Sequence, residues 1–245
     1  MINKLEFLKE FWAKKNDPLH PIHSEEESDK YYKEVLFHVY GHKTIVDAGC
    51  GSGEITVRLA KDFEKVIGID FSESMVQVLR EKIAKDNINN VEVYVDDVLN
   101  INKLVKEKVD VVLNSAQIQY VNIQQAETFI ANSKEILKDD GIIVLLFVLN
   151  ANLEYLYYSG LFRDYTQKLT LNQLIKKLMR FSYTVWKEKI KDKNYEYSKE
   201  LGFWHYTSDY IEIAKRLDLN IEFFQSFYPP YGYRFNVKLS KKNKL

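Results

Sequence analysis

The feature that most constrains the fold of this 245-residue chain is a regular alternation of short apolar runs with helical segments, from Thr44 to Val148. Five apolar runs have the length and composition of buried strands: residues 44–48, 66–69, 91–95, 109–113 and 142–148. Segments with apolar residues at helical spacing lie between them, over 55–63, from Ser72 onward, and over 125–137. Strands that alternate with helices form a parallel sheet covered on both faces. The pattern therefore predicts an α/β fold with a central, mostly parallel sheet.

The alternation stops after residue 150 and resumes near residue 206. Residues 151–205 are rich in tyrosine and mostly helical in pattern, which predicts an inserted lid over the carboxyl edge of the sheet. Thr207 is a suitable N-cap for a helix that ends near Leu217. Two strand candidates follow, 221–224 and 233–239, and their short connection predicts an antiparallel hairpin.

We expect a single domain, 1–245, in four parts. An amphipathic helical cap (1–40) precedes a cofactor-binding core (41–150), the helical aromatic-rich insertion over the acceptor site (151–205), and a C-terminal helix with the hairpin (206–245).

Charge and cysteine content narrow the partners and the compartment. Lysine plus arginine and aspartate plus glutamate number 35 each, so the net charge is zero, and we expect neither a nucleic-acid nor a membrane partner. The cluster from Lys187 to Lys199 is interleaved with acids and is typical of solvated surface. Cys50 is the sole cysteine, which indicates no disulfide and no zinc site, hence no metal and a cytoplasmic protein. We find neither a signal peptide nor a run of membrane-spanning length.

A glycine-rich turn follows the first strand. The segment Asp47-Ala48-Gly49-Cys50-Gly51-Ser52-Gly53 stands directly before a helix. Glycines there allow a tight turn and let a ligand approach backbone N–H groups at the helix N-terminus. Their spacing, G-x-G-x-G, differs from the dinucleotide-binding G-x-G-x-x-G. The turn indicates a ligand site of another type.

Acidic residues end the next two strands. Asp70, after the second strand, can accept hydrogen bonds from both hydroxyls of a ribose. Asp96 and Asp97, after the third, can accept the exocyclic amine of an adenine. Each acid alone is equally explained as a helix N-cap. All of them beside the glycine turn, at one edge of the sheet, favour a ligand site.

Taken together, these motifs resemble class I S-adenosylmethionine-dependent methyltransferases of the small-molecule type, over residues 44–148 and again over 207–239. The resemblance implies a Rossmann-like seven-stranded sheet with an antiparallel last strand. It implies S-adenosylmethionine as cofactor and S-adenosylhomocysteine as product, with Asp70 on the ribose and Asp97 on the adenine. The implied cofactor-binding residues are Asp47, Ala48, Gly49, Cys50, Gly51, Gly53, Asp70, Phe71, Met75, Asp96, Asp97, Val98, Asn114 and Ser115.

Candidate acceptor-side residues follow the fourth strand and lie around the insertion. Many members of the family have a histidine where this chain has Gln119, so a histidine base at that position is not expected. The predicted catalytic residues are His205, Tyr120 and Gln119, with His205 as base or orienting group. A packed loop histidine is the alternative for His205. The predicted substrate contacts are Gln117, Arg163, Tyr206, Tyr231 and Arg234, although the tyrosines could instead pack the insertion on the core.

The predicted function is methyl transfer to a small polar metabolite, such as a sugar, a nucleotide-linked precursor or a hydroxylated acid. Transfer to oxygen is favoured over transfer to nitrogen. Two alternatives stay open at this point: an RNA-directed methyltransferase, for which no appended basic module is visible, and a non-catalytic S-adenosylmethionine-binding partner subunit. The sequence does not predict the oligomeric state.

Overall fold

The computed structural model describes residues 25–158, 170–190, 202–227 and 232–242. Seven strands in these residues form one sheet, in the order β3-β2-β1-β4-β5-β7-β6. Their bounds are β1 Thr44–Ala48, β2 Lys65–Asp70, β3 Val91–Val95, β4 Val109–Ser115, β5 Leu137–Leu149, β6 Leu219–Gln225 and β7 Arg234–Lys241. β7 runs antiparallel to both of its neighbours, β5 and β6, while the pairs among β1 to β5 are parallel. The predicted α/β class and antiparallel last strand are confirmed.

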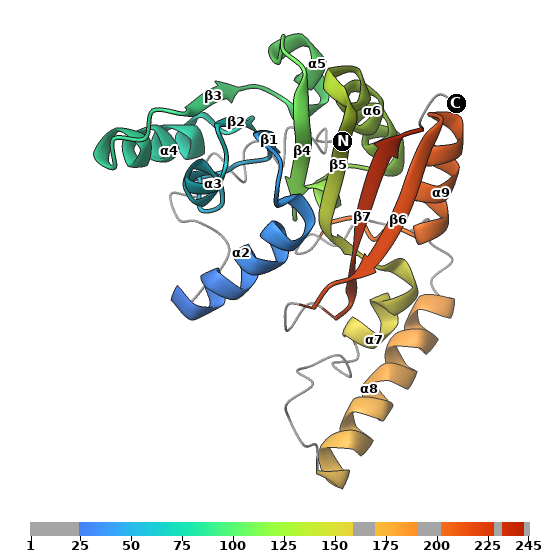
Figure 1. Cartoon of the computed structure of the whole chain (residues 1–245). Helices are drawn as coiled ribbons and strands as arrows, with labels where there is room; N and C mark the ends of the chain where they lie inside the picture. Colours follow the sequence, from blue (N-terminus) through green and yellow to red (C-terminus); the bar gives the residue numbers. More distant parts are fainter. Residues whose placement is uncertain (1–24, 159–169, 191–201, 228–231, 243–245) are drawn as a thin grey trace.

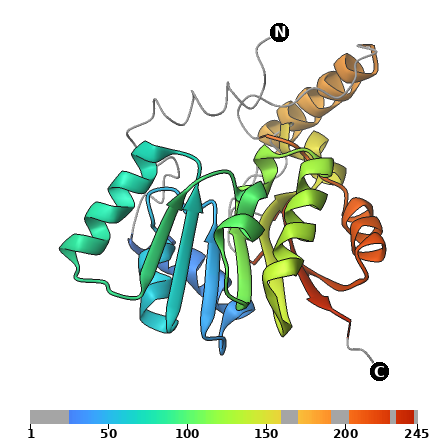
Figure 2. The ribbon, with the colours of Figure 1, turned by 90° about the horizontal axis from the view of Figure 1, so that it is seen from above.

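Helices cover both faces of the sheet (Figures 1 and 2). The longer ones are α2 Glu25–Val39, α3 Thr56–Asp62, α4 Glu73–Lys85, α6 Ile123–Ile136, α8 Leu171–Ile190 and α9 Thr207–Arg216; short α5 Ile101–Leu104 and α7 Glu154–Tyr158 and the 3₁₀ turns Val98–Asn100, Ile118–Tyr120 and Ala151–Leu153 complete the list. Alternate strand residues serve opposite faces, as the period of two requires. Val46 and Val112 pack with α5, α6 and α9, whereas Ile45 and Val111 pack with α2 and α3.

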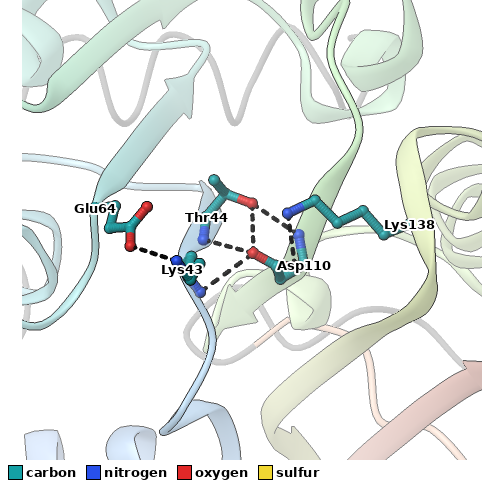
Figure 3. A network of polar contacts seen from close by, with 5 residues as sticks. All are labelled: Lys43, Thr44, Glu64, Asp110 and Lys138. Atoms are coloured by element: carbon teal, nitrogen blue, oxygen red, sulfur yellow. Dashed lines mark hydrogen bonds and ion pairs between the residues drawn. The ribbon is translucent and has the colours of Figure 1, made fainter.

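A polar network joins β1, β4 and β5 where these strands begin (Figure 3). Asp110 of β4 accepts hydrogen bonds from the backbone N–H of Thr44 at 2.8 Å and from the Thr44 hydroxyl at 2.8 Å. Lys138 of β5 donates to the other carboxylate oxygen at 2.8 Å, and Lys43 pairs with Glu64 at 2.8 Å. This network fixes the amino edge of the sheet.

Two local predictions were wrong. The strand predicted at 142–148 begins earlier: β5 starts at Leu137 and pairs there with Val109, so residues 139–141, which read as a turn in the sequence, lie inside it. The N-cap of α9 is Tyr206, not Thr207, and the Asp209 carboxylate accepts the Tyr206 backbone N–H at 3.2 Å. Neither difference moves a strand in the sheet order.

The described part of the insertion is helical, as predicted. α7 follows β5, and α8 packs against α7 and extends from it away from the sheet (Figure 1). Neither α7 nor α8 contributes a residue to the lining of the pocket at the carboxyl ends of β1, β2 and β4.

Candidate functional site

A pocket opens at the carboxyl ends of β1, β2 and β4. Its lining comprises Tyr31, Asp47, Gly49, Cys50, Gly51, Ser52, Glu54, Ile55, Asp70, Phe71, Ser72, Met75, Ser115, Ala116, Gln117 and Tyr120. Eight of the predicted cofactor residues are brought together there, along with two predicted acceptor-side residues, Gln117 and Tyr120. The pocket lies at the sheet edge where open α/β sheets bind ligands.

The glycine-rich loop after β1 is tied to β2 by its own backbone. The N–H groups of Gly49 and Cys50 donate to the carbonyl of Ile69, at 2.7 and 3.1 Å. Gly49 has φ +89°, and a Cβ added there would lie 2.6 Å from Cγ of Gln117. Both the backbone conformation and the close approach of Gln117 therefore require glycine at this position.

Asp70 organises the same loop from the end of β2. One of its carboxylate oxygens accepts the Gly51 N–H at 2.9 Å, and the other accepts the Ser72 N–H at 2.9 Å. Burial raises the pKa of Asp70 above its usual range, although these backbone N–H groups favour the charged form. Each carboxylate oxygen keeps a lone pair for a further donor, as two vicinal hydroxyls would need.

Asp47 lies deeper, at the end of β1. Its side chain is buried and accepts a hydrogen bond from the Thr56 hydroxyl at 2.7 Å. Burial raises its pKa to about 6, the Thr56 hydrogen bond opposes that rise, and the charge of Asp70 adds to it. At neutral pH the carboxyl is mostly ionised, and a nearby cation would favour that form.

The lining is acidic. It includes the carboxyl groups of Asp47, Glu54 and Asp70, and no lysine, arginine or histidine is among the described residues that form it. In a partly buried site such charges attract a cation and repel an anion. A pyrophosphate would lack a positive partner here, whereas a sulfonium or ammonium group would have one.

The acids after β3 adjoin the pocket edge but are not in its lining. The backbone N–H of Asp96 donates to the Asp70 carbonyl at 3.0 Å, so the ends of β2 and β3 are in contact. The Asp97 carboxylate accepts the Leu99 N–H at 2.9 Å as the N-cap of a 3₁₀ turn. Val98 is buried in the core. Asp97 therefore has the N-cap role that the sequence offered as the alternative to adenine binding. Its contact with an adenine stays a prediction.

Three other predicted cofactor residues, Ala48, Gly53 and Asn114, lie behind the lining. The Asn114 amide donates to the Ala48 carbonyl at 3.1 Å and to the Gln117 side-chain oxygen at 2.7 Å, and its own oxygen accepts the Ile118 N–H at 2.8 Å. Asn114 is fully buried and joins the ends of β1 and β4. It positions the pocket wall.

The acceptor side of the pocket carries Tyr120. Burial raises the pKa of its phenol above the usual range, although the Gln119 side chain and the charge of Arg234 oppose the rise. Tyr120 is therefore a neutral hydroxyl at physiological pH. Gln119 is buried outside the lining, and its backbone carbonyl accepts the Phe203 N–H at 2.7 Å.

His205 is packed in the interior, outside the pocket lining. It is 2% exposed, its Nδ1 lies 3.0 Å from the Tyr210 hydroxyl, and its backbone N–H donates to Leu149. Burial lowers its pKa to about 4, although Asp209 and the Val121 backbone favour the charged form. This placement favours the packed-histidine alternative over the predicted base.

The remaining predicted substrate residues are dispersed. Tyr206 caps α9 on the surface, and Arg234 is buried with its guanidinium donating to the Phe147 carbonyl at 3.3 Å. Arg163 and Tyr231 lie outside the described residues. No group of three or more potential metal ligands occurs in the part of the chain that the structure describes.

Six lining residues were not predicted: Tyr31, Ser52, Glu54, Ile55, Ser72 and Ala116. Tyr31 is the most informative, because it comes from α2 and its hydroxyl lies 2.7 Å from the Ser115 hydroxyl. Its ring stacks on Phe147 at 4.6 Å. The amphipathic pattern of the N-terminal region predicts a helix there, but no local signal places that helix over the pocket.

Comparison with known proteins agrees with this geometry. Residues 45–141 match the model of a family described as a methyltransferase domain. An uncharacterized RNA methyltransferase of Clostridium tetani is 39% identical over 71 residues, 29% of this chain and 16% of that protein. The malonyl-[acyl-carrier protein] O-methyltransferase of Bacillus cereus is 31% identical over 103 residues, 41% of this chain and 35% of that protein. This chain thus spans about a third or less of these curated relatives.

A solved structure shares the fold over nearly the whole length. It is the magnesium protoporphyrin IX methyltransferase of Synechocystis PCC 6803 with bound S-adenosylmethionine, superposed with a TM-score of 0.58 at 12% identity over 99% of both chains. At that identity the likeness concerns the fold.

Proposed function

Residues 45–141 match a methyltransferase domain, and on that premise we propose that this protein is a class I, S-adenosylmethionine-dependent methyltransferase that acts on a small polar metabolite. The observation that carries the proposal is the acidic pocket, whose described lining has three carboxyl groups and no basic side chain. S-adenosylmethionine supplies, when bound, an electrophilic methyl group on a cationic sulfur. The lining suits that cation and does not suit a dinucleotide.

The residues that would hold the cofactor are those of the glycine loop and the strand ends. Asp70 would accept the ribose hydroxyls, since it lines the pocket and each of its oxygens keeps acceptor capacity beyond one backbone N–H. Asp47 would stabilise the cationic portion. Gly51 supports this assignment, because an added Cβ there meets no protein atom within 4 Å. The φ of Gly51, +50°, already favours glycine there, and the open space beside it would let a ligand approach the backbone.

The acceptor would bind beside Gln117, Tyr120 and the Tyr31–Ser115 pair. These groups offer neutral hydroxyl and amide contacts, which suit a polar acceptor. Tyr120 would donate a hydrogen bond to it, because the raised pKa keeps the phenol protonated. With no histidine among the described lining residues, we infer an acceptor oxygen that is acidic enough to react without a strong enzyme base. That inference favours transfer to a hydroxylated or carboxylated acid.

The experiment first measures cofactor binding and then methyl transfer. Calorimetric titration with S-adenosylmethionine, S-adenosylhomocysteine and NAD should show binding of the first two alone. Radiolabelled S-adenosylmethionine is then offered with panels of sugars, nucleotides, hydroxy acids and total RNA. Label in a small molecule supports the proposal, and label only in RNA would replace it by the RNA-directed alternative. Tight binding without label in any panel would favour the non-catalytic alternative.

A further inference from the structure

Helix α8 carries an apolar stripe that the described part of the protein does not cover. Its members recur at intervals of three and four residues, so they share one side of the helix. They are Leu171, Leu174, Ile175, Leu178, Met179, Tyr183 and Trp186, each between 38% and 71% exposed. An exposed stripe of this size is unusual on a monomeric soluble protein and marks an interaction surface.

The opposite side of α8 is basic. At about 100° per residue, Lys177 and Arg180 lie across the helix from the centre of the stripe, and Lys176 flanks the stripe beside Tyr183. Residues 171–186 contain no aspartate or glutamate, although acids and bases balance over the whole chain. The helix therefore combines a local positive charge with an open apolar stripe.

We propose that α8 lies in the headgroup region of an anionic membrane, with the apolar stripe facing the acyl chains. A basic amphipathic helix with aromatic residues on its apolar side is the form that binds such a surface. Burial of the stripe and attraction of the lysines and arginine to anionic lipids add in this arrangement. Tyr183 and Trp186 have rings that suit the boundary between headgroups and acyl chains.

The arrangement of the two sides selects lipid over other partners. RNA would bind the basic side and leave the apolar stripe in water. A second copy of this chain that paired α8 with α8 would cover the stripe with an identical basic helix, which offers Lys176 and Lys177 no opposite charge. An anionic lipid interface meets both sides at once. No helix in the described residues is long and apolar enough to cross a bilayer.

This proposal revises the expectation of no membrane partner, which rested on the net charge of the entire chain. Zero net charge removes a long-range field but leaves local charge patterns in place, and the Debye length is only about 8 Å at physiological ionic strength. The proposal does not depend on the methyl-transfer activity.

The experiment is co-sedimentation of the full chain with phosphatidylcholine vesicles, made with and without phosphatidylglycerol. Binding is expected only with phosphatidylglycerol and should fall with added salt. Met179→Asp lies in the stripe. This variant and the double variant Lys176→Glu/Lys177→Glu should each bind the vesicles at least about tenfold more weakly than the wild type. Tyr40→Asp is the matched control, because Tyr40, directly after α2, is 79% exposed and lies outside the stripe. It should bind as the wild type does.

A second readout locates the contact. Trp186 emission should shift to the blue on vesicles, and Trp186→Phe should abolish that shift. Absence of binding to anionic vesicles at low salt would overturn the proposal, as would binding that Met179→Asp leaves unchanged. Sedimentation velocity tests the competing partners. If the protein is a dimer and Met179→Asp dissociates it, the stripe serves self-association. If the protein binds added RNA and Met179→Asp does not weaken that binding, α8 serves nucleic-acid binding.

Discussion

Replacing Asp70 by asparagine separates the structural role of this carboxylate from its proposed binding role. The two oxygens of Asp70 accept the Gly51 and Ser72 N–H groups, and asparagine keeps one acceptor oxygen. Burial nevertheless raises the pKa of Asp70, so the fold disfavours its charge. Relief of that penalty offsets part of the lost hydrogen bond. We therefore expect a change in the free energy of unfolding within about 2 kcal/mol, which shifts Tm by less than about 8 °C.

The expected loss in binding is larger. A hydroxyl bound to a carboxylate contributes about 1.5–3 kcal/mol. Asparagine offers one acceptor where two ribose hydroxyls would donate, and it has no charge. A loss of about 3 kcal/mol corresponds to a dissociation constant roughly 100-fold higher for S-adenosylhomocysteine. Isothermal titration calorimetry measures it, after thermal unfolding has established that the variant is folded.

The matched control is Asp110→Asn, which removes a carboxylate from the amino edge of the same sheet (Figure 3). This variant should bind S-adenosylhomocysteine within about twofold of the wild type, an energy difference under about 0.5 kcal/mol. A folded Asp70→Asn protein with unchanged affinity would refute the ribose assignment. An equal loss in Asp110→Asn would show that the effect is not specific to the pocket.

Three further outcomes are expected. Asp110 is partly desolvated, but its bonds to Lys138 and Thr44 hold its pKa at about 2; its contribution to stability is present above pH 4 and is lost as pH falls through about 2. Asp110→Asn should thus lower stability at pH 7 by about 1–2 kcal/mol, measured by calorimetric unfolding. Asp47 has a raised pKa of about 6, so protonation favours the fold and stability from this group rises as pH falls from about 6 towards 4. Affinity for S-adenosylmethionine should fall over the same window, and Asp47→Asn should lose that pH dependence in titrations. Gly53→Ala would place a Cβ 2.2 Å from Cδ1 of Leu79 at φ +85° and should cost more than about 2 kcal/mol. Gly41→Ala, at φ +89° with no atom within 4 Å, should cost only about 1 kcal/mol of backbone strain in denaturant titrations.

The sheet could be predicted because its strands are short apolar runs separated by helices, and that alternation leaves few topologies. The residue at which β5 begins could not be predicted. Residues 139 and 140 are acidic and exposed, so their side chains indicate a turn, yet their backbone continues the strand. Strand pairing is decided by the neighbouring backbone, here that of Val109 in β4, which pairs with Leu137. Side-chain patterning carries little information about it at a solvent-exposed sheet edge.

Some residues of the candidate site could likewise be predicted from the sequence, and others could not. The loop from Asp47 to Gly53 and the acid at Asp70 could be predicted, because their chemistry is local and their strands bring them to one edge. Tyr31 could not, because its place beside Ser115 depends on how α2 packs on the sheet. Histidine chemistry suggested His205 as a base, but burial beside Tyr210 decides its environment. Residue type alone does not predict burial at a loop position.

Aspartates at the two edges of the sheet have opposite energetic effects. At the amino edge, Lys138 and the Thr44 donors outweigh the burial of Asp110, so its pKa falls and its charge stabilises the fold. At the carboxyl edge, burial outweighs the donors around Asp47 and Asp70, so both pKa values rise and both charges oppose folding. No lysine or arginine lines the described pocket to offset them. Charges that a fold holds at a cost to its stability are typical of binding sites, and a cationic ligand supplies the counter-charge that the chain does not.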